Sequence, residues 1–599
     1  ECGGTIGINA ECAGSGASMS IDLRPGLQTA VAHLTVDNPE LWWPAGFGDQ
    51  KRYELKVKTD HDEYIRKVGF RTIEVLTEED DHGRGMVFRV NGKDIFCKGS
   101  NWIPMDAMPG RYSSSRYEEL LQSAVDANMN MLRVWGGGHY EHDYFYETCD
   151  RLGIMIWQDF MFSCALYPSD SKFLEEVREE VSFQVKRLKD HPCIALWCGN
   201  NEDVGALTWF EESRINRDRY IIDYDRLNEG VIGRTVKALD PNRRWWPSSP
   251  SAGENDFSDC WHDDTKGDMH YWSVWHEGKP FESYYDVTPR FCSEFGFQSL
   301  PSAALARSFS PHEQLNITSP VMEHHQKNEM GNAIIIASIS RYFRFPSGFE
   351  ETIYLSQIQQ AMAIQTAVEY WRSRRPVCMG SLYWQLNDNW PVASWSSIEY
   401  GGRWKPLHYS ARRFYAPQHL CIIHRPEGHV SFYGLNDGST DLRGTLTVQL
   451  LGFDGRLLEK KVVPGTIAAE SASLLYEIDT GMDWPAAEYG LENCFYYGSF
   501  ESESGEIALE NSKLLMVPKK CSIQPADIGI RTHIEAGKLA LELTTDTPAF
   551  YTVVDIPGFH VRFSDNNFTL LPGNGKKIEL IEDGGVDLST LADRSWSIH

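Results

Sequence analysis

The chain has 599 residues, 42% hydrophobic and 24% charged, which are ordinary proportions for a globular protein. At roughly 100–200 residues per domain, this length predicts about three to five domains. The formal net charge of −27 argues against nucleic acid or an anionic membrane as a partner, because both require a basic surface. No run of apolar residues approaches the length of a membrane span.

Residues 1–86 alternate between apolar and polar positions, as β-strands do. Segments 29–39 and 53–59 repeat with period two, and turn residues bound them. We therefore expect a small immunoglobulin-like β-sandwich in residues 1–86.

From residue 87 to residue 416, short apolar segments alternate with helical stretches. Eight segments are candidate strands: 95–101, 129–135, 154–159, 194–202, 243–249, 268–272, 290–296 and 380–388. Between the third and fourth, apolar residues fall on one helix face: Leu174, Val177, Val181, Val185 and Leu188. Ser115 and Glu118 have the spacing of a capping box. This alternation predicts a (β/α)8 barrel, because no glycine-rich dinucleotide fingerprint follows any of the strands.

After residue 416 the pattern of β-strands returns. Break signals near residues 518–520 divide this part into two expected β-sandwiches, 417–519 and 520–599. The sequence thus predicts a central α/β barrel flanked by all-β domains.

The 13 cysteines are scattered, and no CxxC pair occurs. Several lie in apolar runs, so we expect buried free thiols rather than a disulfide framework. Free thiols favour a cytoplasmic location. A lysosomal or secreted location stays open, because residue 1 is Glu and no targeting signal can be judged.

Two carboxylates follow strands on opposite sides of the expected barrel: Glu202 after the fourth and Glu294 after the seventh. Functional groups of such barrels gather at the carboxyl ends of the strands. Cleaving a glycosidic bond requires an acid for the leaving oxygen and a carboxylate on the opposite face of the sugar. A separation of about 5–5.5 Å would make the second carboxylate a nucleophile and retain configuration. The alternative is that each Glu is a salt-bridged residue of the rim.

Several motifs carry a resemblance to a known family: GSNWIPMD (99–106), RVWGGGHYE (133–141), WQDFMFSCALYP (157–168), WCGNNE (197–202), RFCSEFGFQS (290–299), WQLNDNWPVASW (384–395) and FSDNNFTLLPG (563–573). From about residue 40 to the end, the chain resembles the β-mannosidase branch of glycoside hydrolase family 2. The resemblance implies a (β/α)8 barrel flanked by immunoglobulin-like β-sandwich domains. It also implies a retaining exo-β-mannosidase that releases terminal non-reducing β-D-mannose by double displacement, without metal or cofactor.

The resemblance further implies a role for each matching polar residue of the site. Glu202 would be the general acid/base and Glu294 the nucleophile. Asn201 would hydrogen-bond the axial 2-hydroxyl of mannose. Arg133 would help keep Glu294 ionised, and Tyr271 would orient it.

Three tryptophans complete the expected substrate site. Trp135 and Trp384 would form walls of the pocket for the terminal sugar, and Trp209 would lie on the leaving-group side. The expected partner is a β-mannoside oligosaccharide or glycan, and the oligomeric state, monomer or dimer, is left open. Family members usually begin with a further sugar-binding-like β domain that supplies part of the pocket, and this sequence has no counterpart of it.

Three other functions remain open at this point. Another exo-β-glycosidase of the same family, such as a β-galactosidase or an exo-glucosaminidase, would use the same two carboxylates. A non-catalytic glycan-binding remnant would not need either of them. A structural scaffold would bind no sugar at all.

Overall fold

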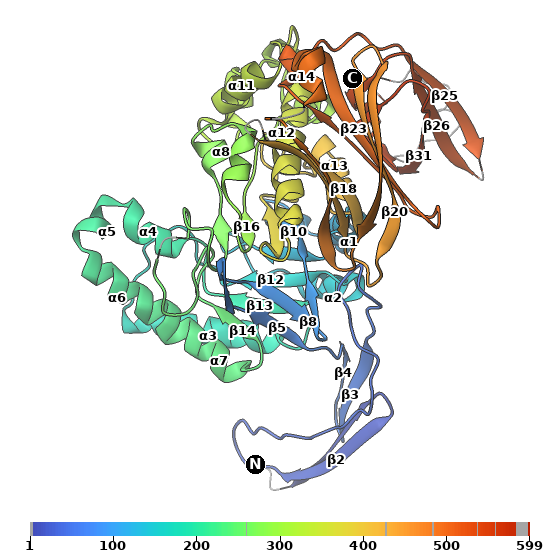
Figure 1. The fold of residues 1–599 in the computed structure, drawn as a ribbon. Helices are drawn as coiled ribbons and strands as arrows, with labels where there is room; N and C mark the ends of the chain where they lie inside the picture. The colour runs from blue at the N-terminus through green and yellow to red at the C-terminus, as the bar shows by residue number, and fades with distance from the viewer. Residues whose placement is uncertain are drawn as a thin grey trace.

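The computed structural model describes residues 4–258, 260–425, 428–481, 484–535, 537–556, 559–582 and 597–598. Figure 1 shows a barrel at the centre, a β-sheet arm at the N-terminal end and β-sandwiches at the C-terminal end. Within the described ranges, no helix has both the length and the apolar character that crossing a bilayer requires.

Eight parallel strands form the central sheet, in the order β14-β13-β12-β11-β10-β17-β16-β15. Their bounds are β10 (Cys97–Trp102), β11 (Met131–Val134), β12 (Met155–Asp159), β13 (Ile194–Cys198), β14 (Arg244–Trp246), β15 (Met269–His270), β16 (Cys292–Glu294) and β17 (Gly380–Tyr383). The first barrel strand, β10, pairs with the last, β17, as well as with β11, so the sheet curls back on itself. Next to β14 and β15, an isolated bridge joins Ser251 to Asp268. The eight predicted strands and the barrel class are confirmed.

Helices surround this sheet, and the barrel strands are buried on both sides, as parallel strands usually are. Their bounds are α1 (Ser114–Asp126), α2 (Asp143–Leu152), α3 (Ser171–Leu188), α4 (Asp203–Trp209), α5 (Glu211–Ile215), α6 (Arg217–Leu227), α7 (Arg234–Leu239), α8 (Ser273–His276), α9 (Ala303–Phe309), α10 (Pro320–His324), α11 (Gly331–Tyr342), α12 (Phe349–Ser373) and α13 (Pro406–Phe414). The predicted apolar face of α3 is confirmed, since all five of its residues are buried.

The predicted start of α1 is wrong by two residues. Ser115 lies inside the helix, and Ser113 is the N-cap: its hydroxyl accepts a hydrogen bond from the Arg116 amide at 3.2 Å. Ser113 has the extended backbone that an N-cap requires, whereas Ser115 is already helical. Three consecutive serines made this choice ambiguous from sequence.

The N-terminal arm is a four-stranded antiparallel sheet, β2-β1-β3-β4. Its strands are β1 (Thr5–Cys12), β2 (Ser15–Asp22), β3 (Tyr53–Thr59) and β4 (Glu63–Val68). The predicted strand at 29–39 is wrong. Its side chains alternate between half-buried and exposed, with Val31 65% exposed, but none of the described strands pairs with it. A period-two pattern indicates an extended backbone, but an extended segment becomes a β-strand only when a neighbouring strand hydrogen-bonds to it.

A second small sheet, β5-β8-β9, links this arm to the barrel. Its strands are β5 (Ile73–Leu76), β8 (Val87–Val90) and β9 (Lys93–Ile95), and β6 (Glu79–Asp80) pairs with β7 (Gly83–Arg84). Strands β5 and β8 pair with one another, although the predicted domain boundary after residue 86 lies between them in the sequence. Their apolar side chains belong to the core of the barrel. The domain boundaries at 86, 416 and 519 remain a proposal.

The C-terminal part contains antiparallel sheets that pack in pairs. Strands β18 (Gln418–His424), β19 (His429–Asn436) and β22 (Ser471–Asp479) face β20 (Leu442–Gly452), β21 (Leu457–Ile467), β23 (Cys494–Ser502) and β24 (Ala508–Leu514), with α14 (Pro485–Tyr489) between. The last part contains β25 (Ile528–Glu535), β26 (Lys538–Thr545), β27 (Ala549–Thr552), β28 (Val554–Asp555), β29 (Arg562–Phe563), β30 (Phe568–Leu570), β31 (Lys576–Glu582) and β32 (Ser597–Ile598). The flanking β-sandwich class is confirmed.

The cysteines match the expectation of free thiols. All the cysteines in the described ranges are unpaired, and each is buried except Cys164, which is exposed. Cys2 lies outside the described residues.

Candidate active site

The predicted site residues gather at the carboxyl ends of the barrel strands. Arg133 is in β11, Asn201 and Glu202 follow β13, Glu294 ends β16, and Trp384 follows β17. Glu202 has a left-handed backbone (φ 64°) directly before α4, and its amide donates to the Ser249 carbonyl at 2.9 Å. The local turn therefore fixes where this carboxylate points.

Glu294 is held by a buried arginine. Arg133 is fully buried, and its Nη1 donates to Glu294 Oε1 at 2.5 Å. Its Nη2 donates to Asp159 Oδ2 at 2.8 Å and to Asn201 Oδ1 at 2.7 Å. Burial raises the pKa of Glu294 to about 7, and the Arg133 charge opposes that rise. The predicted contact between Arg133 and Glu294 is present.

Glu202 lies in a different environment, without a cation in hydrogen-bond contact. Its Oε1 is 2.6 Å from His270 Nδ1, and its Oε2 accepts from the Cys164 thiol at 3.3 Å. Burial first, and then the negative charge of Glu294, raise the pKa of Glu202 well above its ordinary value. Glu294 is therefore the carboxyl group that ionises more readily, because its cation favours the charged form.

The two carboxylates face one another across His270. One oxygen of each carboxylate and one nitrogen of His270 all lie within 4.8 Å of one another. His270 Nδ1 is also 3.5 Å from Glu294 Oε2. A pair of close carboxyl groups with unequal pKa values is the arrangement that divides acid and nucleophile roles.

Asn201 is buried beside this pair with its amide fixed in one orientation. Its oxygen accepts from Arg133, and its Nδ2 donates to Ser163 Oγ at 3.2 Å and Cys164 Sγ at 3.3 Å. Asn201 is thus next to Glu202 in space as well as in sequence.

The structure does not place Tyr271 where it could orient Glu294. The Tyr271 hydroxyl donates to the Ser283 carbonyl at 2.9 Å, and the ring packs against Tyr284. The side chains of its neighbours His270 and Trp272 contact Glu294, whereas Tyr271 contacts it only through the backbone amide, which donates to the Glu294 carbonyl at 2.8 Å. Strand β15 ends at His270, and its pairing with β16 brings the His270 side chain to Glu294.

The predicted tryptophans lie around the rim. The rings of Trp135 and Trp384 meet edge to face with centroids 4.9 Å apart, and both are half-buried. Trp209 is 40% exposed at the end of α4 and packs against Trp261 at 5.6 Å. Trp261 in turn packs against His270 at 5.4 Å. Trp261 therefore lies beside His270, which contacts both Glu202 and Glu294.

Sequence analysis missed His270, Trp272, Cys164 and Trp261. His270 and Trp272 lay in the same HYW motif as Tyr271, and strand alternation was the signal that would have selected them. Cys164 and Trp261 come from loops, and no spacing in the sequence brings them to the site.

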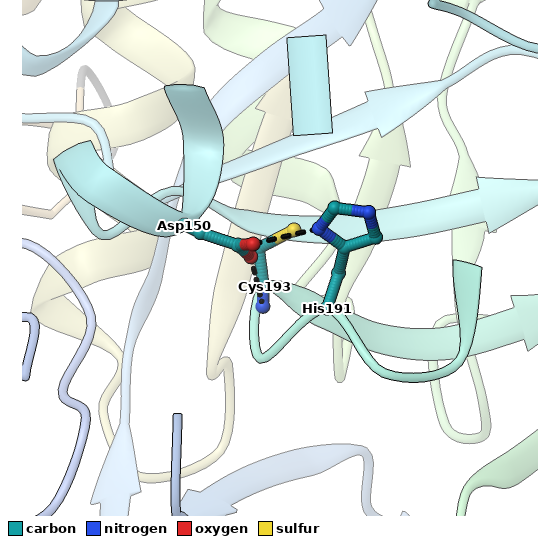
Figure 2. Close-up of side chains that lie close together, drawn as sticks. All are labelled: Asp150, His191 and Cys193. Atoms are coloured by element: carbon teal, nitrogen blue, oxygen red, sulfur yellow. Dashed lines mark hydrogen bonds and ion pairs between the residues drawn. The ribbon is translucent and has the colours of Figure 1, made fainter. Parts of the chain in front are cut away.

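In the part of the chain that the structure describes, two groups of side chains have donor atoms close enough together for a metal ion. In the first, Glu202, His270 and Glu294, a cation would lie beside the Arg133 charge, which disfavours it. The second is Asp150, His191 and Cys193, shown in Figure 2. There Asp150 Oδ2 is 2.6 Å from His191 Nδ1, and Oδ1 accepts from the Cys193 amide at 3.0 Å. These bonds already join α2 to the loop before β13, so the group acts as a structural link.

Three family profiles match the chain. They are described as "Glycosyl hydrolases family 2" (residues 9–71), "Mannosidase Ig/CBM-like domain" (428–520) and "Ig-fold domain" (523–594). The flanking regions of the barrel therefore match modules of one enzyme family.

Several named relatives match over most of the chain. A β-mannosidase of Capra hircus is 36% identical over 589 residues, which cover 92% of this chain and 66% of the relative. A β-mannosidase B of Aspergillus terreus is 36% identical over 68% of this chain and 50% of its own length. The chain therefore spans about two thirds or less of the length of these relatives.

Solved structures give the same result. A β-D-mannosidase from Dictyoglomus thermophilum superposes with a TM-score of 0.87 at 31% identity, covering 99% of this chain and 72% of that one. An exo-chitosanase from Amycolatopsis orientalis, at 17% identity and a TM-score of 0.77, shares the fold. The barrel, its β-sandwiches and the facing carboxylates are thus the framework of a glycosyl hydrolase. The chain belongs to glycosyl hydrolase family 2, within its β-mannosidase group.

Proposed function

We propose that this chain carries the catalytic site of an exo-β-mannosidase that releases terminal non-reducing β-D-mannose from manno-oligosaccharides or glycans. The observation that carries the proposal is the pair Glu202 and Glu294, with oxygens within 4.8 Å and different charge environments. Oxygens this close support a retaining rather than an inverting pair, since inversion needs about 6.5–9.5 Å between the carboxyl groups to admit a water molecule.

In the first step of the proposed reaction, ionised Glu294 attacks the anomeric carbon, and the carbon–oxygen bond to the leaving group breaks. Protonated Glu202 gives its proton to the departing oxygen, so the leaving group departs as an alcohol. The product is a mannosyl ester on Glu294. Arg133 keeps the attacking oxygen ionised, and Asn201 is placed to bind the sugar 2-hydroxyl.

In the second step, Glu202 takes a proton from water, and the oxygen of that water attacks the anomeric carbon from the opposite face. The ester bond breaks, Glu294 regains its charge, and mannose leaves with the β configuration. Esterification removes the charge that raised the pKa of Glu202, so this carboxyl becomes a base for the second step.

The sugar position follows from the aromatic rim. Trp135 and Trp384, whose rings meet edge to face, would hold the terminal mannose. Trp209 packs against Trp261, which packs against His270, and these two tryptophans would contact the leaving group. The partner is then a β-mannoside oligosaccharide or glycan, and monomer and dimer remain alternatives.

Another exo-β-glycosidase activity remains the alternative, because the fold is shared with an exo-chitosanase. A panel of aryl β-glycosides separates the two: the proposal requires the mannoside to be hydrolysed faster than the galactoside, the glucoside and the glucosaminide.

The proposal is tested by hydrolysis of an aryl β-mannoside, followed by NMR for the configuration of the first product. β-Mannose should appear first, and Glu294→Gln should lower the rate by roughly 10³-fold or more. Glu211→Gln, an exposed position on α5, is the matched control and should retain the wild-type rate. α-Mannose as first product would refute retention. Binding of mannose without turnover would indicate the glycan-binding remnant.

A further inference from the structure

A large cavity lies away from the catalytic carboxylates, where three parts of the chain meet. Its volume is about 740 Å³, within the range of roughly 300–1,000 Å³ that is usual for small-molecule sites. Its walls come from η3 (Phe281–Asp286) and α12 of the barrel, from β18 and β24 of the first C-terminal sandwich, and from β30 of the last part. Ligand sites occur preferentially at such domain junctions.

The walls combine aromatic faces with hydrogen-bonding groups. The aromatic residues include Tyr285, Trp484, Tyr497 and Phe550. The buried carboxylate of Glu369 accepts from Asn511 Nδ2 at 3.0 Å, and Lys513 Nζ lies 3.4 Å from the Tyr285 hydroxyl. Flat apolar faces beside both donors and acceptors suit a sugar, whose rings carry C–H faces and hydroxyl edges.

The cations of the cavity wall are largely neutralised, which disfavours a simple anion. Arg413 and Lys576 both pair with Asp565, and Lys577 pairs with Glu535 at 2.5 Å. Lys513 and Lys520 also line the cavity, but so do the carboxylates Glu282, Glu369 and Glu510. This balance of charges favours a neutral ligand.

We propose that this cavity is a second saccharide site, which binds a neutral manno-oligosaccharide apart from the catalytic centre. The choice of mannose rests on the proposed function, whereas the neutral saccharide class rests on the cavity itself.

The test counts the mannobiose molecules bound per chain by calorimetry, in a Glu294→Gln background that prevents turnover. Thr366 lines the cavity, and Thr366→Trp fills it. Thr352→Trp is the matched control, because both hydroxyls donate to a carbonyl four residues back on α12, at 2.7 Å each. The filled variant should bind one molecule fewer than the control.

Equal binding in the two variants, or displacement of mannobiose by inorganic phosphate, would overturn the proposal. If Thr366→Trp fails to fold, Lys513→Met gives the same test and should weaken binding at least about tenfold. Failure of the proposed catalytic function would be seen separately, as absence of aryl mannoside hydrolysis by the wild type.

A second, independent inference concerns the proton of the catalytic acid. Asp268 is fully buried, and its Oδ1 accepts from Trp246 Nε1 at 2.8 Å and from the Ser251 amide at 2.9 Å. Its Oδ2 accepts from Ser249 Oγ at 2.7 Å and from Ser293 Oγ at 2.5 Å. Burial raises the pKa of Asp268, and the hydrogen bonds from Ser293, Ser249 and Trp246 oppose that rise because they favour the ionised form, which can only accept.

The direction of the remaining bonds follows from this charge. Ser249 has one hydroxyl proton, which it donates to Asp268, so His270 Nε2 at 2.9 Å must donate to Ser249 Oγ. Burial lowers the pKa of His270 well below its ordinary value, so the ring is neutral and its Nδ1 carries no proton. Glu202 Oε1, 2.6 Å from that nitrogen, must then be the donor.

We infer that Asp268, Ser249 and His270 form a hydrogen-bond chain that keeps the proton on Glu202 in the free enzyme. These three are positioning residues, because they act on the substrate through Glu202. The role of these three residues rests on the proposed function of Glu202, whereas their arrangement rests on the hydrogen-bond distances.

The test compares Ser249→Ala with Ser248→Ala. Both serines are fully buried neighbours, but Ser248 Oγ donates to Asn200 Oδ1 at 2.6 Å and not to the chain. In Ser249→Ala, His270 is free to carry its proton on Nδ1 and donate to ionised Glu202. The basic limb of the kcat/KM profile should then move about one pH unit lower.

The ¹⁵N spectrum of labelled histidine reports the tautomer of His270 directly, even without turnover. The wild type and Ser248→Ala should show the Nε2–H form, and Ser249→Thr should restore it. An Nδ1–H form in the wild type would overturn the inference. If Ser249→Ala does not fold, Asp268→Asn reverses the donor at the start of the chain and should change the same spectrum.

Discussion

Replacing Arg133 by methionine removes the one cation that touches both Glu294 and Asp159. A nearby opposite charge lowers a carboxyl pKa by roughly 1–3. Loss of Arg133 should therefore move the pKa of Glu294 from about 7 to roughly 8–10. Below its pKa the ionised fraction of a carboxyl falls tenfold per pH unit. At pH 6, kcat/KM should thus fall roughly 10- to 1,000-fold.

The same substitution has a stability effect whose sign follows from the pKa. A carboxyl whose folded pKa lies above its ordinary value of 4.5 favours folding when protonated, so that stability is lost as pH rises from about 4.5 through the folded pKa. Breaking a buried ion pair costs about 3–5 kcal/mol. For Arg133→Met, this loss should be smaller at pH 5 than at pH 8.

The assay is a pH–rate profile with an aryl β-mannoside, together with thermal unfolding at both pH values. Arg151→Met is the control, because Arg151 pairs with Glu118 at the surface, where an ion pair is worth about 0–1 kcal/mol. A folded Arg133→Met enzyme whose acidic limb stays at the wild-type pH would refute the reasoning.

Three further predictions address the acid, a domain contact and the helix core. Glu202→Gln should slow alkyl β-mannosides roughly 10²–10⁴-fold but a dinitrophenyl mannoside far less, because that leaving group needs no proton; equal losses would contradict the acid role. Asp437→Asn should destabilise the chain by about 3–5 kcal/mol in chemical unfolding, because it leaves Lys98, 2.8 Å away, buried without its partner. Burial alone would raise the pKa of Asp437, but the cations, Lys98 first, hold it well below its ordinary 3.8. The stability that Asp437 contributes is therefore present above pH 3.8 and is lost in acid. A stability difference between wild type and Asp437→Asn that widens in acid would contradict this. Leu188→Ala should cost about 2–5 kcal/mol and the exposed Glu179→Ala under about 0.5, and similar values for both would argue against the buried face of α3.

The sequence by itself determined the architecture and the meeting of Glu202 and Glu294 at one end of the barrel. Buried parallel strands and amphipathic helices have local periodicities, so eight strands and the face of α3 were predictable. Glu202 and Glu294 were predictable because the ends of barrel strands meet at one rim, whatever the distance between them along the chain.

Tertiary structure decided which side chains complete the site. Tyr271 points away and His270 points in, because the pairing of β15 with β16 fixes which face of the strand meets Glu294. Segment 29–39 has the pattern of a strand but has no pairing partner among the described strands. The chain from Asp268 to Glu202 and the cavity beside α12 join segments far apart in sequence. Their chemistry depends on distances between those segments, and a linear pattern of residues does not contain such distances.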